Sequence, residues 1–97
     1  MIVGRVAVAG HSMLPALRDG EFLLFTSLIA PRRGDVVVAK DPRDERRWVV
    51  KRVREARADA FDLGGDLDGH DVGWVPRAAL LGRVVFRYWP PSRAGFL

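Results

Sequence analysis

Short runs of apolar residues, some alternating with polar ones, follow one another along most of this chain. They are rich in Val and aromatic side chains, which favour β-strands. Turn-forming pairs such as Asp19-Gly20 and Gly64-Gly65 separate them. The pattern predicts strands at residues 2–9, 21–26, 35–39, 47–54, 60–63 and 81–89.

Several short strands at this spacing predict a mostly-β fold, either a small β-barrel or a folded sheet. We expect two short helical turns, at residues 13–17 and at 76–80, where Pro76 suits the start of a helix. Consecutive prolines at 90 and 91 end the last strand, so residues 91–97 are expected to be a loose tail. The predicted single compact domain is therefore residues 1–90.

The composition narrows the classes of function. A chain of 97 residues fits one domain with a modest core. The absence of cysteine excludes disulfides, thiolate zinc sites and cysteine nucleophiles. The net charge is +4, but even the densest basic runs are short, and the run at 43–47 is broken by Asp44 and Glu45. This favours scattered solvated arginines, and we expect no nucleic-acid partner.

No stretch approaches the ~20 apolar residues that span a bilayer, and the N-terminus lacks the features of a signal peptide. The sequence therefore predicts a cytoplasmic protein without a transmembrane anchor. The most apolar part, residues 22–25 with Leu28 and Ile29, is expected to be a buried strand. The alternative is a lip that grips a peptide or makes peripheral contact with a membrane.

Lysine is scarce in this chain: of 16 basic residues only Lys40 and Lys51 are lysines. Lys51 lies within an apolar run, and strand alternation places it on the same face as Val49 and Val53. If that face is buried, desolvation lowers the pKa of Lys51 and permits it to act as a neutral base. If the opposite face is buried, Lys51 is a surface residue. Lys40 ends its strand beside a turn and is the weaker candidate.

Ser12 lies between Gly10 and Pro15, in a tight turn after the first predicted strand. A serine hydroxyl is a weak nucleophile that needs a neighbouring base, and the Ser12 N–H could stabilise an oxyanion. A turn serine that bonds its own backbone is the alternative. Together, Ser12 and Lys51 suggest a Ser/Lys hydrolytic dyad.

The two histidines are alternative bases. His11 is adjacent to Ser12, and neighbouring side chains diverge, so it is a poor partner. His70 lies in the acidic run 66–71, which could serve a Ser/His mechanism or bind a metal. The run lacks the spacing of a calcium loop, and an acidic surface loop is the favoured interpretation. We expect neither a metal nor a cofactor.

As a set, these residues resemble the signal peptidase I family of Ser/Lys peptidases, over roughly residues 8–85. Residues 10–17 are similar to its nucleophile box, 33–38 to its Gly-Asp strand, 50–53 to its general-base box and 82–84 to its closing Gly-basic-Val segment. The resemblance implies a β fold like that of signal peptidases and SOS-type repressors. It also implies Ser12 as nucleophile, with its N–H as oxyanion donor, and Lys51 as general base.

The family's third box is altered here. Gly65-Asp66 begins it, but Leu67 replaces the usual Asn, and residues 68–72 lack the usual Ser and Arg. Those groups normally orient the lysine, so other residues must support the site. The candidates are Asp66, Asp71, Met13 and Arg52. Gly10 also lacks the hydroxyl that assists the oxyanion in the family.

The strand at residues 82–90 resembles that of the nickel-type superoxide dismutase maturation proteases. This implies removal of an N-terminal propeptide from such a precursor, whose extended segment would be the partner. A truncated signal-peptidase-like or SOS-repressor-like protease is an alternative. So is a catalytically weakened barrel that binds peptide or nucleic acid. The sequence does not determine the oligomeric state.

Overall fold

The computed structural model describes residues 2–67 and 69–97. Within these residues, eight strands form one antiparallel sheet in the order β1-β2-β7-β3-β4-β5-β6, with β8 beside β7. The strands are β1 (Val3–Ala7), β2 (Phe22–Thr26), β3 (Val36–Asp41), β4 (Asp44–Ala56), β5 (Ala60–Gly64), β6 (Asp71–Pro76), β7 (Leu80–Trp89) and β8 (Gly95–Phe96).

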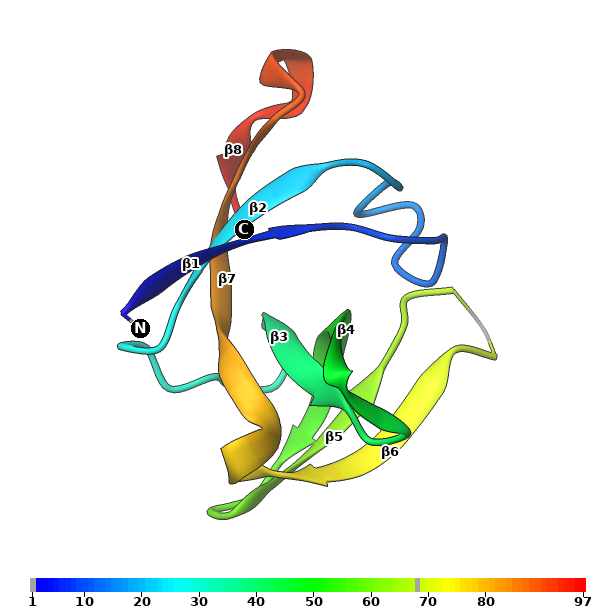
Figure 1. Ribbon diagram of the computed structural model, residues 1–97, viewed down its shortest axis with the longest axis vertical. Helices are drawn as coiled ribbons and strands as arrows, with labels where there is room; N and C mark the ends of the chain where they lie inside the picture. The colour runs from blue at the N-terminus through cyan, green and yellow to red at the C-terminus, as the bar shows by residue number, and fades with distance from the viewer. Residues whose placement is uncertain (1, 68) are drawn as a thin grey trace.

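Strand β7 connects the two halves of the molecule (Figure 1). It pairs with β2 and β8 in the upper half and with β3 in the lower half, where β4, β5 and β6 continue the sheet. Strands β1 and β6 end this path, so the sheet is folded and not closed into a barrel. The mostly-β single domain predicted from the sequence is confirmed, in its folded-sheet form.

The sheet is covered on both faces where it bends at β3. Val37 and Val38 are neighbours in β3 and both are fully buried, but they belong to different apolar clusters. The first cluster joins Val38 to Met13 and Phe25, among others. The second joins Val37 to residues of β4, β5 and β6. Burial on both faces explains why residues 36–39 are continuously apolar.

The six predicted strands are all present, and β4 begins earlier than expected, at Asp44. The sequence did not predict β6, because Gly73 and Pro76 are unusual within a strand. Pairing with β5, which sets Val75 opposite Phe61, overrides that local preference. The expected acidic loop at 66–71 therefore ends where β6 begins, and its residue 68 lies outside the described residues.

The predicted helical turn at 13–17 is a hydrogen-bonded turn, in which the Leu17 N–H donates to the Met13 carbonyl at 2.9 Å. It does not extend into a helix, and Gly20, with a φ of +82°, turns the chain into β2. The turn expected at 76–80 is the 3-10 segment η1 (Arg77–Ala79). In the described part of the chain, no helix is long and apolar enough to cross a membrane.

The C-terminal residues do not form the loose tail that the sequence indicated. Residues 91–97 fold back as the 3-10 segment η2 (Pro91–Arg93) and β8, which pairs with β7. The Arg93 guanidinium donates to the Glu21 carboxylate at 2.5 Å and to the Ala16 carbonyl at 3.1 Å. The Glu21 residue is only 3% exposed, and this buried ion pair holds the segment in place.

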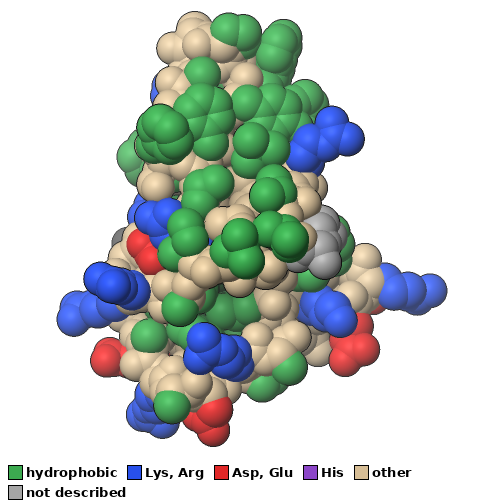
Figure 2. Space-filling model, turned by 90° about the vertical axis from the view of Figure 1, so that its left-hand side faces the viewer, with side chains coloured by type: hydrophobic (Ala, Val, Ile, Leu, Met, Phe, Trp, Pro, Cys, Tyr) green, Lys and Arg blue, Asp and Glu red, His purple; other side chains and the backbone are tan. Residues whose placement is uncertain are grey.

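Apolar side chains also remain at the surface. Figure 2 shows them gathered over the upper part of one face, with charged side chains around its lower part. Within the apolar segment at residues 22–29, Leu23 and Phe25 are buried, while Leu28 is 73% exposed. The segment is therefore a partly buried strand in β2, with Phe22 exposed at its start, and an apolar surface just after the strand.

Candidate active site

The turn that carries Ser12 is fixed on both sides. Val8 before it and Met13 after it are buried in the first cluster. Gly10 has a φ of +86°, which favours glycine, and its N–H donates to the Asp19 carboxylate at 2.7 Å. Met13 therefore anchors the turn in the apolar core, and Ser12 itself is half-buried.

The loop between β5 and β6 packs against the backbone of Ser12. The Leu67 N–H donates to the Ser12 carbonyl at 2.9 Å. A Cβ on Gly65 would lie only 2.4 Å from that carbonyl oxygen, so only glycine permits the approach. The altered third box therefore braces the serine turn through its backbone.

Lys51 lies in the middle of β4, opposite Val37 of β3. Its side chain is half-buried and shares a face with Val49 and Val53, which pack in the second cluster. The expectation that this face is a core face is correct. On the opposite face, Val50 is buried in the first cluster, whereas Trp48 is exposed.

The pKa of Lys51 is lowered from its ordinary value. Burial, which disfavours the ammonium, is the main cause. The charge of Asp41 opposes this shift, the charge of Arg47 adds to it, and the charge of Asp71 opposes it. A larger fraction of Lys51 is therefore neutral near pH 7 than of an ordinary lysine.

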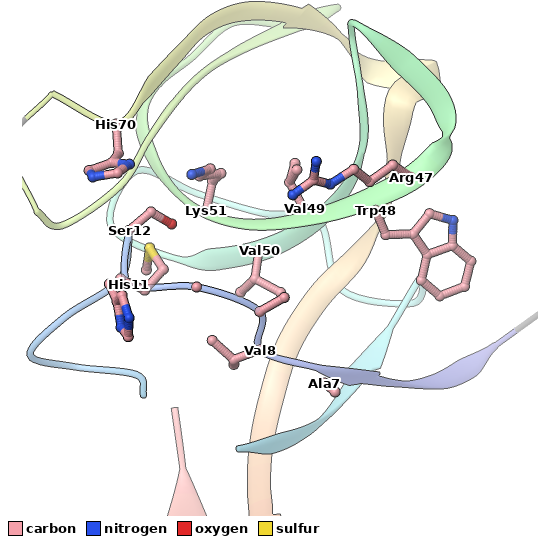
Figure 3. A pocket seen from close by; sticks show the side chains of 13 residues that line it. Ala7, Val8, His11, Ser12, Arg47, Trp48, Val49, Val50, Lys51 and His70 are labelled. Carbon is pink, nitrogen blue, oxygen red and sulfur yellow. The ribbon is translucent and has the colours of Figure 1, made fainter. Parts of the chain in front are cut away.

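Ser12 and Lys51 line the same pocket, of about 240 Å³. Figure 3 shows the Ser12 hydroxyl and the Lys51 amine on the same side of the pocket, with the His70 ring beside them. Among the described residues, none of these three side chains makes a hydrogen bond or an ion pair.

A second pocket of about 320 Å³ adjoins the first. Both are lined by Arg47, Val49, Lys51 and His70, so they form one groove with Lys51 and His70 at its middle. Strand β5 pairs with β4 only from Arg52 onward. Along residues 44–51, no described strand covers the edge of β4 on the side away from β3.

The two aspartates proposed as lysine supports bind arginines instead. Asp66 accepts two hydrogen bonds from Arg52, at 2.8 and 2.7 Å, and Arg52 also donates to the Gly34 carbonyl at 2.9 Å. Asp71 forms an ion pair with Arg54 at 2.7 Å. Asp66 and Arg52 therefore fix the loop to β4, and Asp71 reaches Lys51 only through its charge.

The Ser12 N–H makes no hydrogen bond with any group of the described residues. The oxyanion role of this N–H stays a prediction from the sequence. In the same part of the chain, no three His, Asp or Glu side chains gather as metal ligands would.

The sequence interpretation left His70 in an acidic surface loop, whereas the structure places it in the groove. The signal that could have found it is its position in the third box, where the family resemblance called for a group near the lysine. His11 also lines the first pocket, but its ring points away from Lys51 (Figure 3).

Comparison with known proteins identifies the family of this chain. The family described as "Signal peptidase, peptidase S26" matches residues 1–55. Mitochondrial inner membrane protease subunit 1 of Homo sapiens is 26% identical, over 97% of this chain and 74% of the relative. Mitochondrial ATP-independent inner membrane protease subunit 1a of Arabidopsis thaliana is also 26% identical, over 99% of this chain and 76% of the relative. Signal peptidase I of Leptolyngbya laminosa is 44% identical, over 41% of this chain and 22% of the relative.

Proposed function

Since this chain belongs to the signal peptidase family, peptidase S26, we propose that it is a serine endopeptidase with Ser12 as nucleophile and Lys51 as general base. One observation carries the proposal. The Ser12 hydroxyl and the half-buried Lys51 amine lie on the same side of one pocket (Figure 3).

The proposed reaction uses these two residues in both steps. Neutral Lys51 takes the Ser12 proton as the Ser12 oxygen attacks the scissile carbonyl, and the Ser12 N–H donates to the oxyanion. The Lys51 ammonium then gives this proton to the leaving amine. Lys51 next takes a proton from water, which attacks the acyl-enzyme. The Lys51 ammonium returns its proton to the departing Ser12 oxygen, and the released carboxylic acid loses its own proton to solvent to become a carboxylate.

The substrate is an extended segment of a precursor protein. A peptide laid along the open edge of β4 can form main-chain hydrogen bonds with residues 47–51. The first pocket, whose wall includes Val8 and Val50, can then accept one of its side chains. Removal of an N-terminal propeptide fits this mode of binding. The comparisons give no support to a nickel superoxide dismutase precursor as the substrate. That precursor is therefore only one of the candidates to be assayed.

Peripheral membrane contact is part of the proposal. The relatives have "inner membrane" in their names, and this chain exposes Phe22, Trp89 and Phe96. Phe22 packs beside Trp89, and Phe96 beside Phe86, so they form part of one apolar surface on β2, β7 and β8. The cytoplasmic location stays a prediction from the sequence.

The test is covalent labelling of Ser12 by a fluorophosphonate probe, read by mass spectrometry. We expect labelling of the wild-type chain and its loss in Ser12→Ala and Lys51→Arg, since Arg does not deprotonate in proteins. Lys40→Arg changes the only other lysine and should label normally. Incubation with candidate precursors, with mass measurement of each new N-terminus, then identifies the substrate.

If the wild-type chain is not labelled but still binds peptides, the proposal that it is an enzyme is contradicted. It would favour the weakened binding module instead. Labelling that survives in Lys51→Arg would reject Lys51 as the base.

A further inference from the structure

We infer that His70 is a positioning residue for Lys51, an inference that rests on the proposed function. When Lys51 acts on Ser12, the His70 imidazole accepts a hydrogen bond from one N–H of the Lys51 amine. The two side chains line the same pockets without such a bond in the structure, so the bond forms in the working site. That bond turns the amine so that its lone pair faces the Ser12 hydroxyl. His70 thus takes the place of the groups that the altered third box lacks.

The backbone on either side of His70 is held firmly. Its carbonyl accepts a hydrogen bond from the Gly65 N–H at 2.9 Å. Gly69 before it has a φ of +85°, and Asp71 after it begins β6 and pairs with Arg54 at 2.7 Å. Gly65 connects this geometry to the nucleophile, because it also contacts the Ser12 backbone. The ring therefore has a fixed origin relative to both Ser12 and Lys51.

The other candidate partners of the Lys51 amine, Asp66 and Asp71, are already paired with arginines. Asp66 is occupied by Arg52, and Asp71 by Arg54. His70, by contrast, lines both pockets beside Lys51, and no described residue forms a hydrogen bond with its ring. In Figure 3 the ring lies beside the Ser12 hydroxyl and the Lys51 amine.

The chemistry requires such a partner. A neutral amine has two N–H groups and one lone pair, and the lone pair must face the Ser12 proton for transfer. Lysine has a long flexible side chain, so an unrestrained amine samples many orientations. A neutral imidazole offers one nitrogen that accepts a hydrogen bond, which is what the amine needs.

Three variants test the inference, with the rate of fluorophosphonate labelling at Ser12 as the readout. His70→Ala removes the acceptor and should slow labelling roughly 10- to 100-fold, as expected for a misaligned catalytic group. His70→Asn and His70→Gln place an amide oxygen near one or the other ring nitrogen. We expect at least one of them to restore most of the rate.

A second readout follows the lysine directly. With 13Cε-labelled lysine, the chain gives signals from only Lys40 and Lys51. In His70→Ala the Lys51 signal should show greater side-chain mobility on the ps–ns timescale, and the rescuing variant should reverse this. The Lys40 signal serves as the internal control for changes in the whole fold.

The outcomes separate this inference from the proposed function. If His70→Ala labels at the wild-type rate and its Lys51 mobility is unchanged, the role of His70 is overturned. The dependence of labelling on Ser12 and Lys51 would still stand. Slow labelling that neither amide variant rescues would also overturn it. If Lys51→Arg labels while all three His70 variants fail, then His70 is the base and both proposals fall.

Discussion

The Leu67 N–H donates a hydrogen bond to the Ser12 carbonyl at 2.9 Å. This contact connects the loop after β5 to the turn after β1, two segments more than fifty residues apart in the sequence. The loop therefore determines where the Ser12 turn sits relative to β4. Its neighbour Gly65 makes the contact possible by coming close to the same carbonyl.

Substitution of Gly65 by Ala should displace Ser12. The new Cβ would lie 2.4 Å from the Ser12 carbonyl oxygen, a backbone atom that cannot rotate away. We expect a loss of about 1–3 kcal/mol in the free energy of unfolding, as for other overpacked sites, and slower labelling of Ser12. Urea denaturation and the labelling rate measure the two effects.

Gly95→Ala is the matched control for this prediction. A Cβ at Gly95 meets nothing within 4 Å, and Gly95 has no positive φ. This variant should label and unfold as the wild type does. Equal behaviour of the two alanine variants would show that the contact with Ser12 has no role.

The charges near Lys51 should set the acid limb of the pH–activity profile, which is the pH range over which activity rises from its low value in acid. Neutral Lys51 is the reactive form, so activity should rise with pH through the pKa of Lys51. Arg47→Gln removes a cation that lowers this pKa and should move the limb to higher pH. Asp41→Asn removes an anion that raises this pKa and should move the limb to lower pH.

Titration of the 13Cε-lysine signals measures the pKa of Lys51 in the same variants. Asn at position 41 can still accept the Arg43 N–H bond at its side-chain oxygen, so the turn should persist. Shifts in the same direction for the two variants would contradict electrostatic control of Lys51.

The buried carboxylate of Glu21 should stabilise the fold in a pH-dependent way. Burial raises the pKa of Glu21, but hydrogen bonds from Arg93 and Arg18 and the charge of Arg87 outweigh it, and the net pKa is lowered. Its stabilisation is therefore present above the ordinary glutamate pKa and is lost as the pH falls through the lowered pKa. Glu21→Gln should lower the free energy of unfolding by about 3 kcal/mol at neutral pH, as when a buried ion pair is broken.

Denaturation at neutral and acidic pH checks this difference, which should shrink in acid. Asp44→Asn is the control, because the Arg46–Asp44 pair is exposed and 3.8 Å apart. Such surface pairs contribute about 0–1 kcal/mol. If Glu21→Gln is no less stable than Asp44→Asn, the buried cluster does not hold the C-terminal segment.

The apolar surface on β2, β7 and β8 should bind membranes. Phe96→Ser removes an 87% exposed aromatic side chain and should reduce co-sedimentation with lipid vesicles, because less apolar area enters the interface. Trp74→Ser on β6 is the control, since Trp74 is also exposed but lies in the other half of the sheet. Equal loss in both variants would indicate non-specific adsorption.

The fold was largely predictable because alternation and turn residues act locally. Runs such as residues 35–39 and 81–89 are unambiguous strands. Strand β6 was missed because its stability comes from pairing with β5, which local sequence does not report. The C-terminal segment was mispredicted for a similar reason, since its partner, Glu21, lies over seventy residues away from Arg93.

The site was predictable in part. Ser12 and Lys51 carried local signals, a turn and a charge among apolar residues, and the structure brings them into one pocket. Support by Asp66 or Asp71 was a reasonable expectation from charge, but their arginine partners could be identified only from the fold. The local sequence did not separate His70 from an ordinary loop histidine, and only its position in the third box pointed to a role beside the lysine.

The uncovered edge of β4 has a consequence for solubility. A free strand edge invites pairing with a second copy of the same chain, which leads to aggregation. Here its outer end carries four consecutive charged, exposed residues, 44–47, before the apolar stretch that lines the groove. Two copies that approach through this edge would have to desolvate all four charges, whereas a peptide along residues 47–51 meets only Arg47 among them. The charged end thus protects the open edge against self-association while the inner end stays accessible.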